Sequence, residues 1–178
     1  NTAVGFSSLN ANTTGEQNAA LGRGALQSAT TADNNCAFGD LSLRDNTTGA
    51  SNTACGRAAL LLNTTASNNT AIGFHCLDAS TTASNNTALG ASALTENTTG
   101  AENTVSGQAA MSVNTTGSFN VAMGASSLQN NTTASNNTSI GYASLISNST
   151  GGNNTAIGFA AGYASSVNGN STGSNNTF

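Results

Sequence analysis

The densest chemical signal in the chain is Asn-x-Ser/Thr, the acceptor motif for N-linked glycans, which begins at fifteen asparagines. Seven of these asparagines are separated by seventeen residues or by a multiple of seventeen: Asn12, Asn46, Asn63, Asn97, Asn114, Asn131 and Asn148. Each begins Asn-Thr-Thr or Asn-Ser-Thr, a composition typical of turns. The sequence therefore predicts an exposed turn here and makes these seven the candidate glycan acceptors. The competing interpretation is that a chain rich in Asn and Thr produces the motif by composition alone.

The other eight motifs fall into a second series and a remainder. The second series begins at Asn68, Asn85, Asn136, Asn153 and Asn175, and the remainder begins at Asn130, Asn137 and Asn170. The second series leads directly into a predicted strand, so we expect its asparagines to have a structural role. Neighbouring threonine hydroxyls, for example those of Thr13 and Thr14, are alternative sites for O-linked sugars.

A catalytic or metal-binding constellation is not visible. The single histidine, His75, precedes Cys76 and lies near Asp78, but a Cys and a His adjacent in one strand are poorly placed as nucleophile and base. The cysteines Cys36, Cys55 and Cys76 fall at different places in the repeat, so we expect three free thiols and no metal site. The sequence predicts neither an enzyme nor a bound cofactor.

Charge and hydropathy exclude two further partner classes. The net charge is −4, and three Lys and Arg residues in 178 give no basic surface for nucleic acid. No apolar run is long enough to cross a membrane as a helix. We therefore expect neither nucleic acid nor a membrane span in this segment.

The elements that must position these residues repeat every seventeen residues. Nine units fill residues 1–153, a longer unit fills 154–175, and 176–178 begins another, so residues 1–178 are predicted to form a single repeat domain. We number positions one to seventeen within a unit, with Asn1 at position one. The insert near Tyr163 to Gly169 is predicted to be a cap or a join.

A unit of this length is too short for two helices but suits one turn of a parallel β-solenoid. Two strands are predicted, near positions one to four and six to nine, with a glycine corner between them that requires positive φ. Positions twelve to fifteen would form the return turn. About ten rungs spaced by about 4.8 Å would give a rod about 50 Å long.

Two apolar columns are predicted to form the core of this rod. Position four contributes Val4, Leu21, Phe38, Ile72 and Leu89, and position nine contributes Leu9, Leu26, Leu43, Leu60, Leu77 and Leu94. Because side chains alternate along a strand, positions three and eight would then point outward. Both positions carry mostly small residues, which favours an interface with copies of the same chain.

Stacked rungs bring equivalent positions together. The asparagines at position one, beginning with Asn1, Asn18 and Asn35, are predicted to form an amide ladder. At position six, Asp40 would lie between Arg23 and Arg57 of the adjoining rungs.

The segments Asn-Asn-Thr-Ala-Ile-Gly at 68–73 and 153–158 resemble the head repeats of trimeric autotransporter adhesins and of related tail-fibre-like surface proteins. The similarity runs through positions one to five of nearly every unit. It implies a left-handed parallel β-roll, three chains per rod, an extracellular or cell-surface location and binding to a host or matrix surface. The unit here is longer than the family's, because the Thr-Thr turn is enlarged.

The sequence thus favours a structural extracellular fibre or adhesin segment: a rigid rod that self-associates as a trimer or an end-to-end filament, with covalent glycans and an unidentified surface ligand. Two alternatives compete with this interpretation. In the first, the threonines at positions thirteen and fourteen form an ice-binding array. The second, a carbohydrate-cleaving solenoid, is disfavoured because it needs clustered acids or an aromatic cleft, which the sequence lacks.

Overall fold

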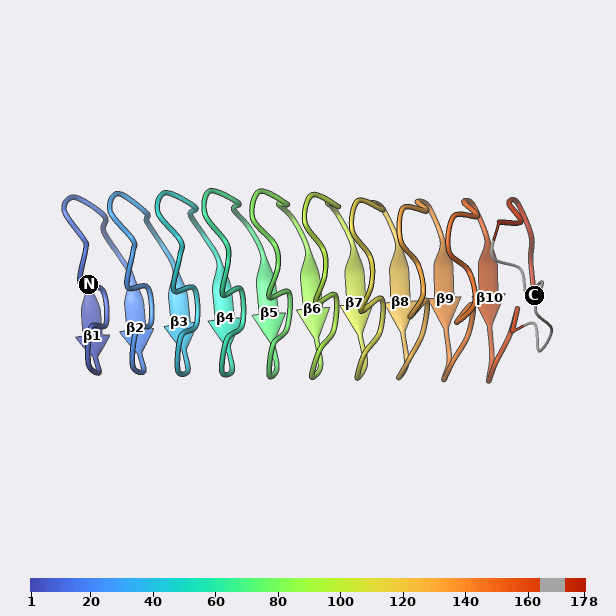
Figure 1. Cartoon of the computed structure of the whole chain (residues 1–178), viewed down its shortest axis with the longest axis horizontal. Helices are drawn as coiled ribbons and strands as arrows, with labels where there is room; N and C mark the ends of the chain where they lie inside the picture. The colour runs from blue at the N-terminus through green and yellow to red at the C-terminus, as the bar shows by residue number, and fades with distance from the viewer. Residues whose placement is uncertain (164–171) are drawn as a thin grey trace.

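The computed structural model describes residues 1–163 and 172–178 and contains one parallel sheet with no helix among them. The Asn170 motif and most of the predicted insert lie outside the described residues. Each strand has three residues, and the sheet order follows the chain (Figure 1). The strands are β1 (Thr2–Val4), β2 (Ala19–Leu21), β3 (Cys36–Phe38), β4 (Thr53–Cys55), β5 (Thr70–Ile72), β6 (Thr87–Leu89), β7 (Thr104–Ser106), β8 (Val121–Met123), β9 (Thr138–Ile140) and β10 (Thr155–Ile157).

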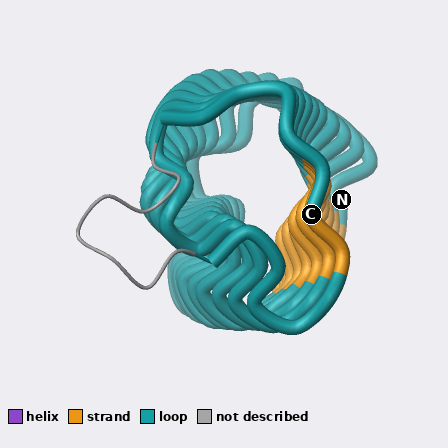
Figure 2. Tube along the Cα trace, turned by 90° about the vertical axis from the view of Figure 1, so that its right-hand side faces the viewer, coloured by secondary structure: helices purple, strands orange, loops and turns teal. Residues whose placement is uncertain are grey.

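Every strand pairs in parallel with the strand one unit away, so equivalent positions face each other along the whole stack. Thr2 pairs with Ala19 at one end, and Ile157 pairs with Ile140 at the other. A bridge between Thr155 and Thr177 begins a further rung in the same register. Figure 2 shows the strands superposed on one side of the coil and turns on the others. The predicted β-solenoid with a seventeen-residue repeat is confirmed.

Only one of the two predicted strands forms in each turn. Positions six to nine are a turn in which positions seven and nine have left-handed backbone angles, such as φ 56° at Ser7 and φ 51° at Leu9. A left-handed residue at every second position prevents an extended strand. The backbone groups still pair between rungs, for example from Leu26 N–H to the Ser42 carbonyl at 3.1 Å.

The core consists of positions three, eight and nine rather than four and nine. The leucine column is confirmed, because Leu26, Leu43, Leu60, Leu77 and Leu94 are fully buried, with Leu9 packed against them at the first rung. The position-four column is wrong: the members exposed to solvent are Val4, Leu21, Phe38, Ile72 and Leu89.

The reason for this inversion is the phase of the short strand. The middle residue of each strand, such as Ala71, points inward and is fully buried, so its neighbours at positions two and four must point outward. Position eight also faces inward, against the next strand, where Cys76 Sγ lies 3.2 Å from the Ala88 carbonyl oxygen. Small residues at positions three and eight therefore fit a narrow interior, not an outer interface.

The corner after each strand is formed by glycine in every unit, as predicted. Gly73, for example, has φ 143°, and a Cβ there would overlap the carbonyl group of Gly90 in the next rung. The corner thus requires glycine for its backbone angle and for the close contact between rungs.

The predicted amide ladder at position one is confirmed. Asn35 donates its backbone N–H to Asn18 Oδ1 at 2.9 Å and its side-chain Nδ2 to the Gly49 carbonyl at 2.9 Å. The same bonds recur along the stack as far as Asn176, whose backbone N–H donates to Asn154 Oδ1 at 3.0 Å. Each buried amide therefore pairs with a backbone N–H of the next rung and with the carbonyl at position fifteen of its own unit.

Candidate functional site

The seven candidate glycan acceptors at position twelve are not exposed. Asn46, Asn63, Asn97, Asn114 and Asn131 have no accessible surface, Asn148 has 1%, and Asn12 of the first unit is half-buried. Because the turn folds over these side chains, sugar has no room at the Nδ2 atoms of the buried members. The prediction of an exposed Asn-Thr-Thr turn is therefore wrong for the asparagines of this column.

The buried amides instead hold the turn closed. Asn63 Nδ2 donates to the Ala66 carbonyl at 3.1 Å and to Asn46 Oδ1 at 2.7 Å in the preceding rung. Where the next unit lacks asparagine at this position, the amide oxygen loses its donor. Asn12 precedes Ala29 and Asn63 precedes Ser80, and both Oδ1 atoms are buried without a partner among the described residues.

The motifs at position seventeen have the opposite environment. Asn68, Asn85, Asn136 and Asn153 are exposed, with φ between 57° and 63°. No hydrogen bond joins their side chains to another described residue, although their backbone N–H groups pair between rungs. The expectation that this column has a structural role is wrong for the side chains.

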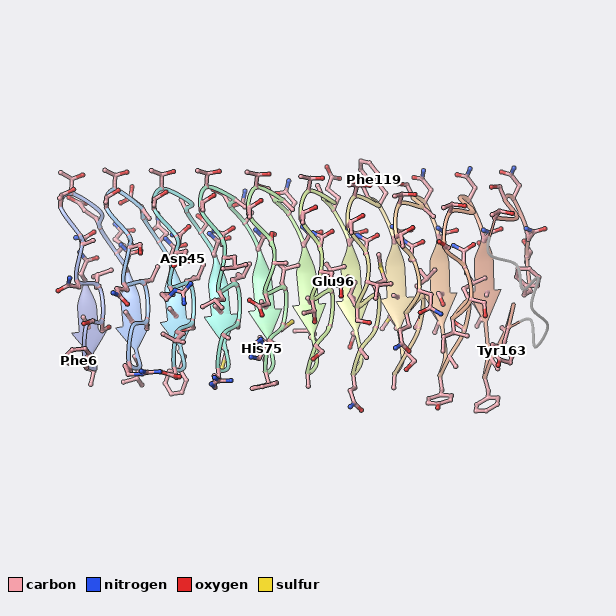
Figure 3. All side chains as sticks on the ribbon, in the orientation of Figure 1. Phe6, Asp45, His75, Glu96, Phe119 and Tyr163 are labelled. Atoms are coloured by element: carbon pink, nitrogen blue, oxygen red, sulfur yellow. The ribbon has the colours of Figure 1, made fainter. Side chains whose placement is uncertain are left out.

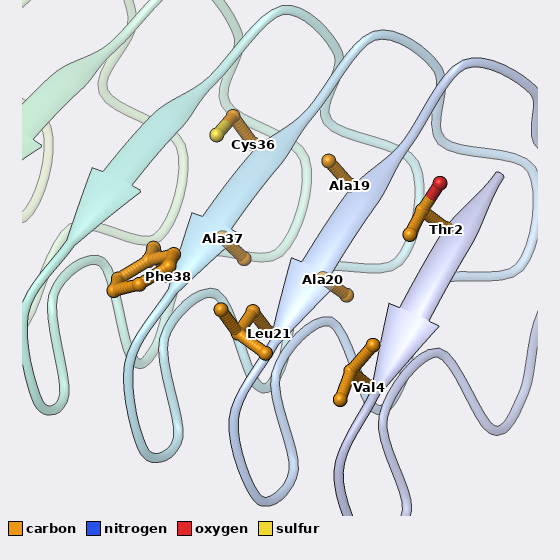
Figure 4. Close-up of a pocket in the computed structure, with 8 residues that line it drawn as sticks. All are labelled: Thr2, Val4, Ala19, Ala20, Leu21, Cys36, Ala37 and Phe38. Carbon is orange, nitrogen blue, oxygen red and sulfur yellow. The ribbon is translucent and has the colours of Figure 1, made fainter.

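Exposed apolar side chains line the outer side of the sheet in eight of its ten strands. We call positions two and four of β1 to β10 the outward strand face. The exposed fractions are 56% for Val4, 54% for Phe38 and 62% for Ile157, and no charged residue occurs at either position. Figure 4 shows Val4, Leu21 and Phe38 in a row, beside a shallow hollow of about 230 Å³ where Ala19 and Cys36 occupy position two.

The two threonine columns differ in how their hydroxyls are used. At position thirteen, Thr13 Oγ1 donates to the Thr30 carbonyl at 2.9 Å, and the same bond recurs along the stack. At position fourteen, every threonine from Thr14 to Thr150 is exposed. A single fully exposed threonine column therefore follows the return turn.

The predicted charge order at position six is confirmed. Asp40 Oδ1 lies 2.8 Å from Arg23 Nε, and Asp40 Oδ2 lies 3.6 Å from Arg57 Nε. The Arg23 hydrogen bond holds the pKa of Asp40 below its ordinary value. The two arginines are exposed and Asp40 is half-buried at the surface, so this cluster verifies the register but contributes little to stability.

His75 and Cys76 do not form a nucleophile and base. His75 Nδ1 lies 2.6 Å from Asp78 Oδ2, its Nε2 lies 3.3 Å from Arg57, and the ring is at the corner edge of the rod (Figure 3). Cys76 is buried on the inner side, where desolvation raises the pKa of its thiol to about 12. The described residues contain no group of three His, Cys, Asp or Glu placed to hold a metal ion. Cys36, Cys55 and Cys76 are free thiols, as expected.

A membrane-crossing helix is also absent from the described residues. Comparison with known proteins adds no relative, because no family model, curated protein or solved structure matches the chain.

Proposed function

We propose that this chain is a segment of a structural extracellular fibre or adhesin, a rigid rod that associates with copies of itself through the outward strand face. One observation carries the proposal: eight of the ten rungs expose an apolar side chain at position four, beside a second uncharged column at position two. Exposed apolar surfaces of this length mark interaction sites in soluble proteins.

The charge distribution favours a second copy as the occupant. Identical chains of net charge −4 repel each other weakly, and the charged residues occupy other positions of the unit. The outward strand face has no charged residue at positions two or four, so two such faces can meet without burying an unpaired charge.

The area of the face is sufficient for association. Ten rungs give the face a length of about 48 Å along the rod. Its width is the length of a three-residue strand, about 10 Å. A pair of copies would bury about 1,000 Å² in total, near the lower limit for a specific interface. The adhesin resemblance implies a trimer, in which three copies would meet through this face around one axis.

Mutation of the face tests the proposal. In the double variant Ile72→Lys with Leu89→Lys, two adjacent rungs place charge on the outward strand face, and we expect sedimentation to give the mass of one 17.4 kDa chain. The matched control, Thr82→Lys with Thr99→Lys, changes exposed position-fourteen residues of the same units and should keep the assembled mass of the wild type. A wild-type chain that sediments as a monomer at all concentrations would contradict the proposal.

The ice-binding alternative rests on the exposed threonine column at position fourteen. Its hydroxyls are spaced by about 4.8 Å along the rod. The adjacent position-thirteen hydroxyls already donate to carbonyl groups, which leaves one exposed rank instead of two. Thermal hysteresis in purified protein, abolished by replacing Thr65, Thr82 and Thr99 with Lys, would support this alternative.

A further inference from the structure

Position-seventeen asparagines that begin the acceptor motif meet two requirements of a glycan acceptor that the position-twelve asparagines fail: an exposed side chain and an amide free of hydrogen bonds to other described residues. Asn68, Asn85, Asn136 and Asn153, which we call the closing asparagines, each begin Asn-Asn-Thr. Their side chains are exposed, and they make no hydrogen bond to another described residue. Each residue also has a left-handed backbone angle, with φ between 57° and 63°.

The fold does not require asparagine at this position. Gln17, Ser51, Glu102 and Phe119 occupy the same place in other units, with φ between 58° and 60°. By contrast, the residue that follows each closing asparagine, such as Asn69, is buried and belongs to the position-one ladder. The exposed amide is therefore available for chemistry without loss of a structural bond.

We propose that the closing asparagines are N-glycosylation sites of this protein, and that the position-twelve motifs are not used. The inference rests on the proposed extracellular function, because the sugar donor is met during secretion. Nδ2 attacks the anomeric carbon of a lipid-diphosphate-linked oligosaccharide. The bond from that carbon to the phosphate oxygen breaks, the lipid diphosphate leaves, and one Nδ2 proton passes to a base of the transferase.

Folding explains why the two columns separate. A sugar on Asn63 would have to occupy the space of the closed turn, where Nδ2 already contacts Ala66 and Asn46. A chain modified there could not complete that rung. The same exposure criterion admits Asn130 and Asn175 and excludes Asn137, which is 1% exposed.

The experiment is site mapping on protein secreted by eukaryotic cells and purified as folded rods. Enzymatic removal of N-glycans in ¹⁸O-labelled water marks each former site, and peptide mass spectrometry locates the label. We expect label at the closing asparagines and none at Asn46, Asn63, Asn114 or Asn131. Label at those position-twelve residues in folded rods, or no label at any closing asparagine, would overturn the proposal.

Matched variants remove the motifs without touching any asparagine. Thr70→Val, Thr87→Val, Thr138→Val and Thr155→Val together abolish the closing motifs, and Val121 already occupies this strand position in another unit. We expect loss of all label from the closing asparagines. The control set, Thr48→Val, Thr65→Val, Thr116→Val and Thr133→Val, abolishes four position-twelve motifs and should leave the glycan mass unchanged.

Sedimentation of the wild-type samples separates this inference from the proposed function, because the Thr→Val variants also alter position two of the outward strand face. If the rods assemble but the closing asparagines carry no sugar, the glycan inference is wrong and the self-association stands. If glycosylated chains remain monomeric, self-association fails while the acceptor assignment holds.

Discussion

One residue type, asparagine, has three roles that depend on its position in the unit. At position one its amide joins successive coils, at position twelve it closes a turn, and at position seventeen it faces solvent. Asn69 and Asn68 are adjacent in sequence yet belong to the first and third groups. Composition alone does not distinguish these roles, because the motif Asn-x-Ser/Thr occurs in both the buried and the exposed columns.

This adjacency gives a stability prediction. Asn69→Ala removes the acceptor of the Asn86 N–H and the donor to the Ala83 carbonyl, both buried. We expect the free energy of unfolding to fall by about 3 kcal/mol, the cost of leaving such groups unpaired. Chemical denaturation monitored by circular dichroism measures the change.

The control for this prediction is Asn68→Ser. Ser51 occupies the same position with φ 59°, so the backbone accepts serine there. We expect a change below about 0.5 kcal/mol, as for other surface substitutions. Equal destabilisation by both variants would show that the ladder does not distinguish the two positions.

The buried thiol gives a prediction of pH dependence. Burial raises the pKa of Cys76 from 9.0 to about 12, so the folded protein favours the neutral thiol. The resulting stabilisation is complete below pH about 9 and is lost as pH rises toward about 12. We expect Cys76→Ala, which matches Ala59 and Ala93 in the same column, to lose less stability than the wild type over this range.

Thiol labelling checks the same environment independently. Cys36 is exposed and should react with an aromatic disulfide reagent in the folded protein, whereas Cys76 should react only after unfolding. Labelling of Cys76 at the rate of Cys36 under native conditions would contradict its burial.

At the scale of the elements, the sequence predicts the period and the glycine corner but not the shape of the second half of the coil. Leucine rarely adopts a left-handed backbone conformation. The leucine at position nine therefore makes the second segment read as an extended strand in the sequence. Inter-rung hydrogen bonds and burial of the leucine hold it in this conformation. The sequence also does not determine which residues of the first strand face inward. A strand of three residues is too short for its alternation to distinguish the core side from the solvent side.

The glycine corner can be tested at this scale. Gly73→Ala would place a methyl group against the Gly90 carbonyl at a strained φ of 143°, and we expect a loss of about 3 kcal/mol or more. Gly24→Ala is the comparison, since Ala58 and Ala109 adopt similar backbone angles at that position. Thermal unfolding should show a large decrease for the first variant and a small one for the second.

At the scale of the whole molecule, stacking aligns one apolar residue from each unit into a row along the rod. The sequence shows that position four is apolar in almost every unit, which by itself suits a core as well as an interface. The structure places this column outside because the narrow interior takes alanine from the strand and leucine from the turn. The outward strand face is therefore the feature that the sequence could not assign and on which the proposed function depends.

A cryo-electron microscopy reconstruction of the assembled protein at side-chain resolution would show directly which surfaces of the rod meet. We predict that neighbouring chains meet along positions two and four of β1 to β10, with Ile72 and Leu89 covered and the threonines of position fourteen open to solvent. A reconstruction in which the outward strand face is open to solvent and the chains meet elsewhere would show that this face does not mediate self-association.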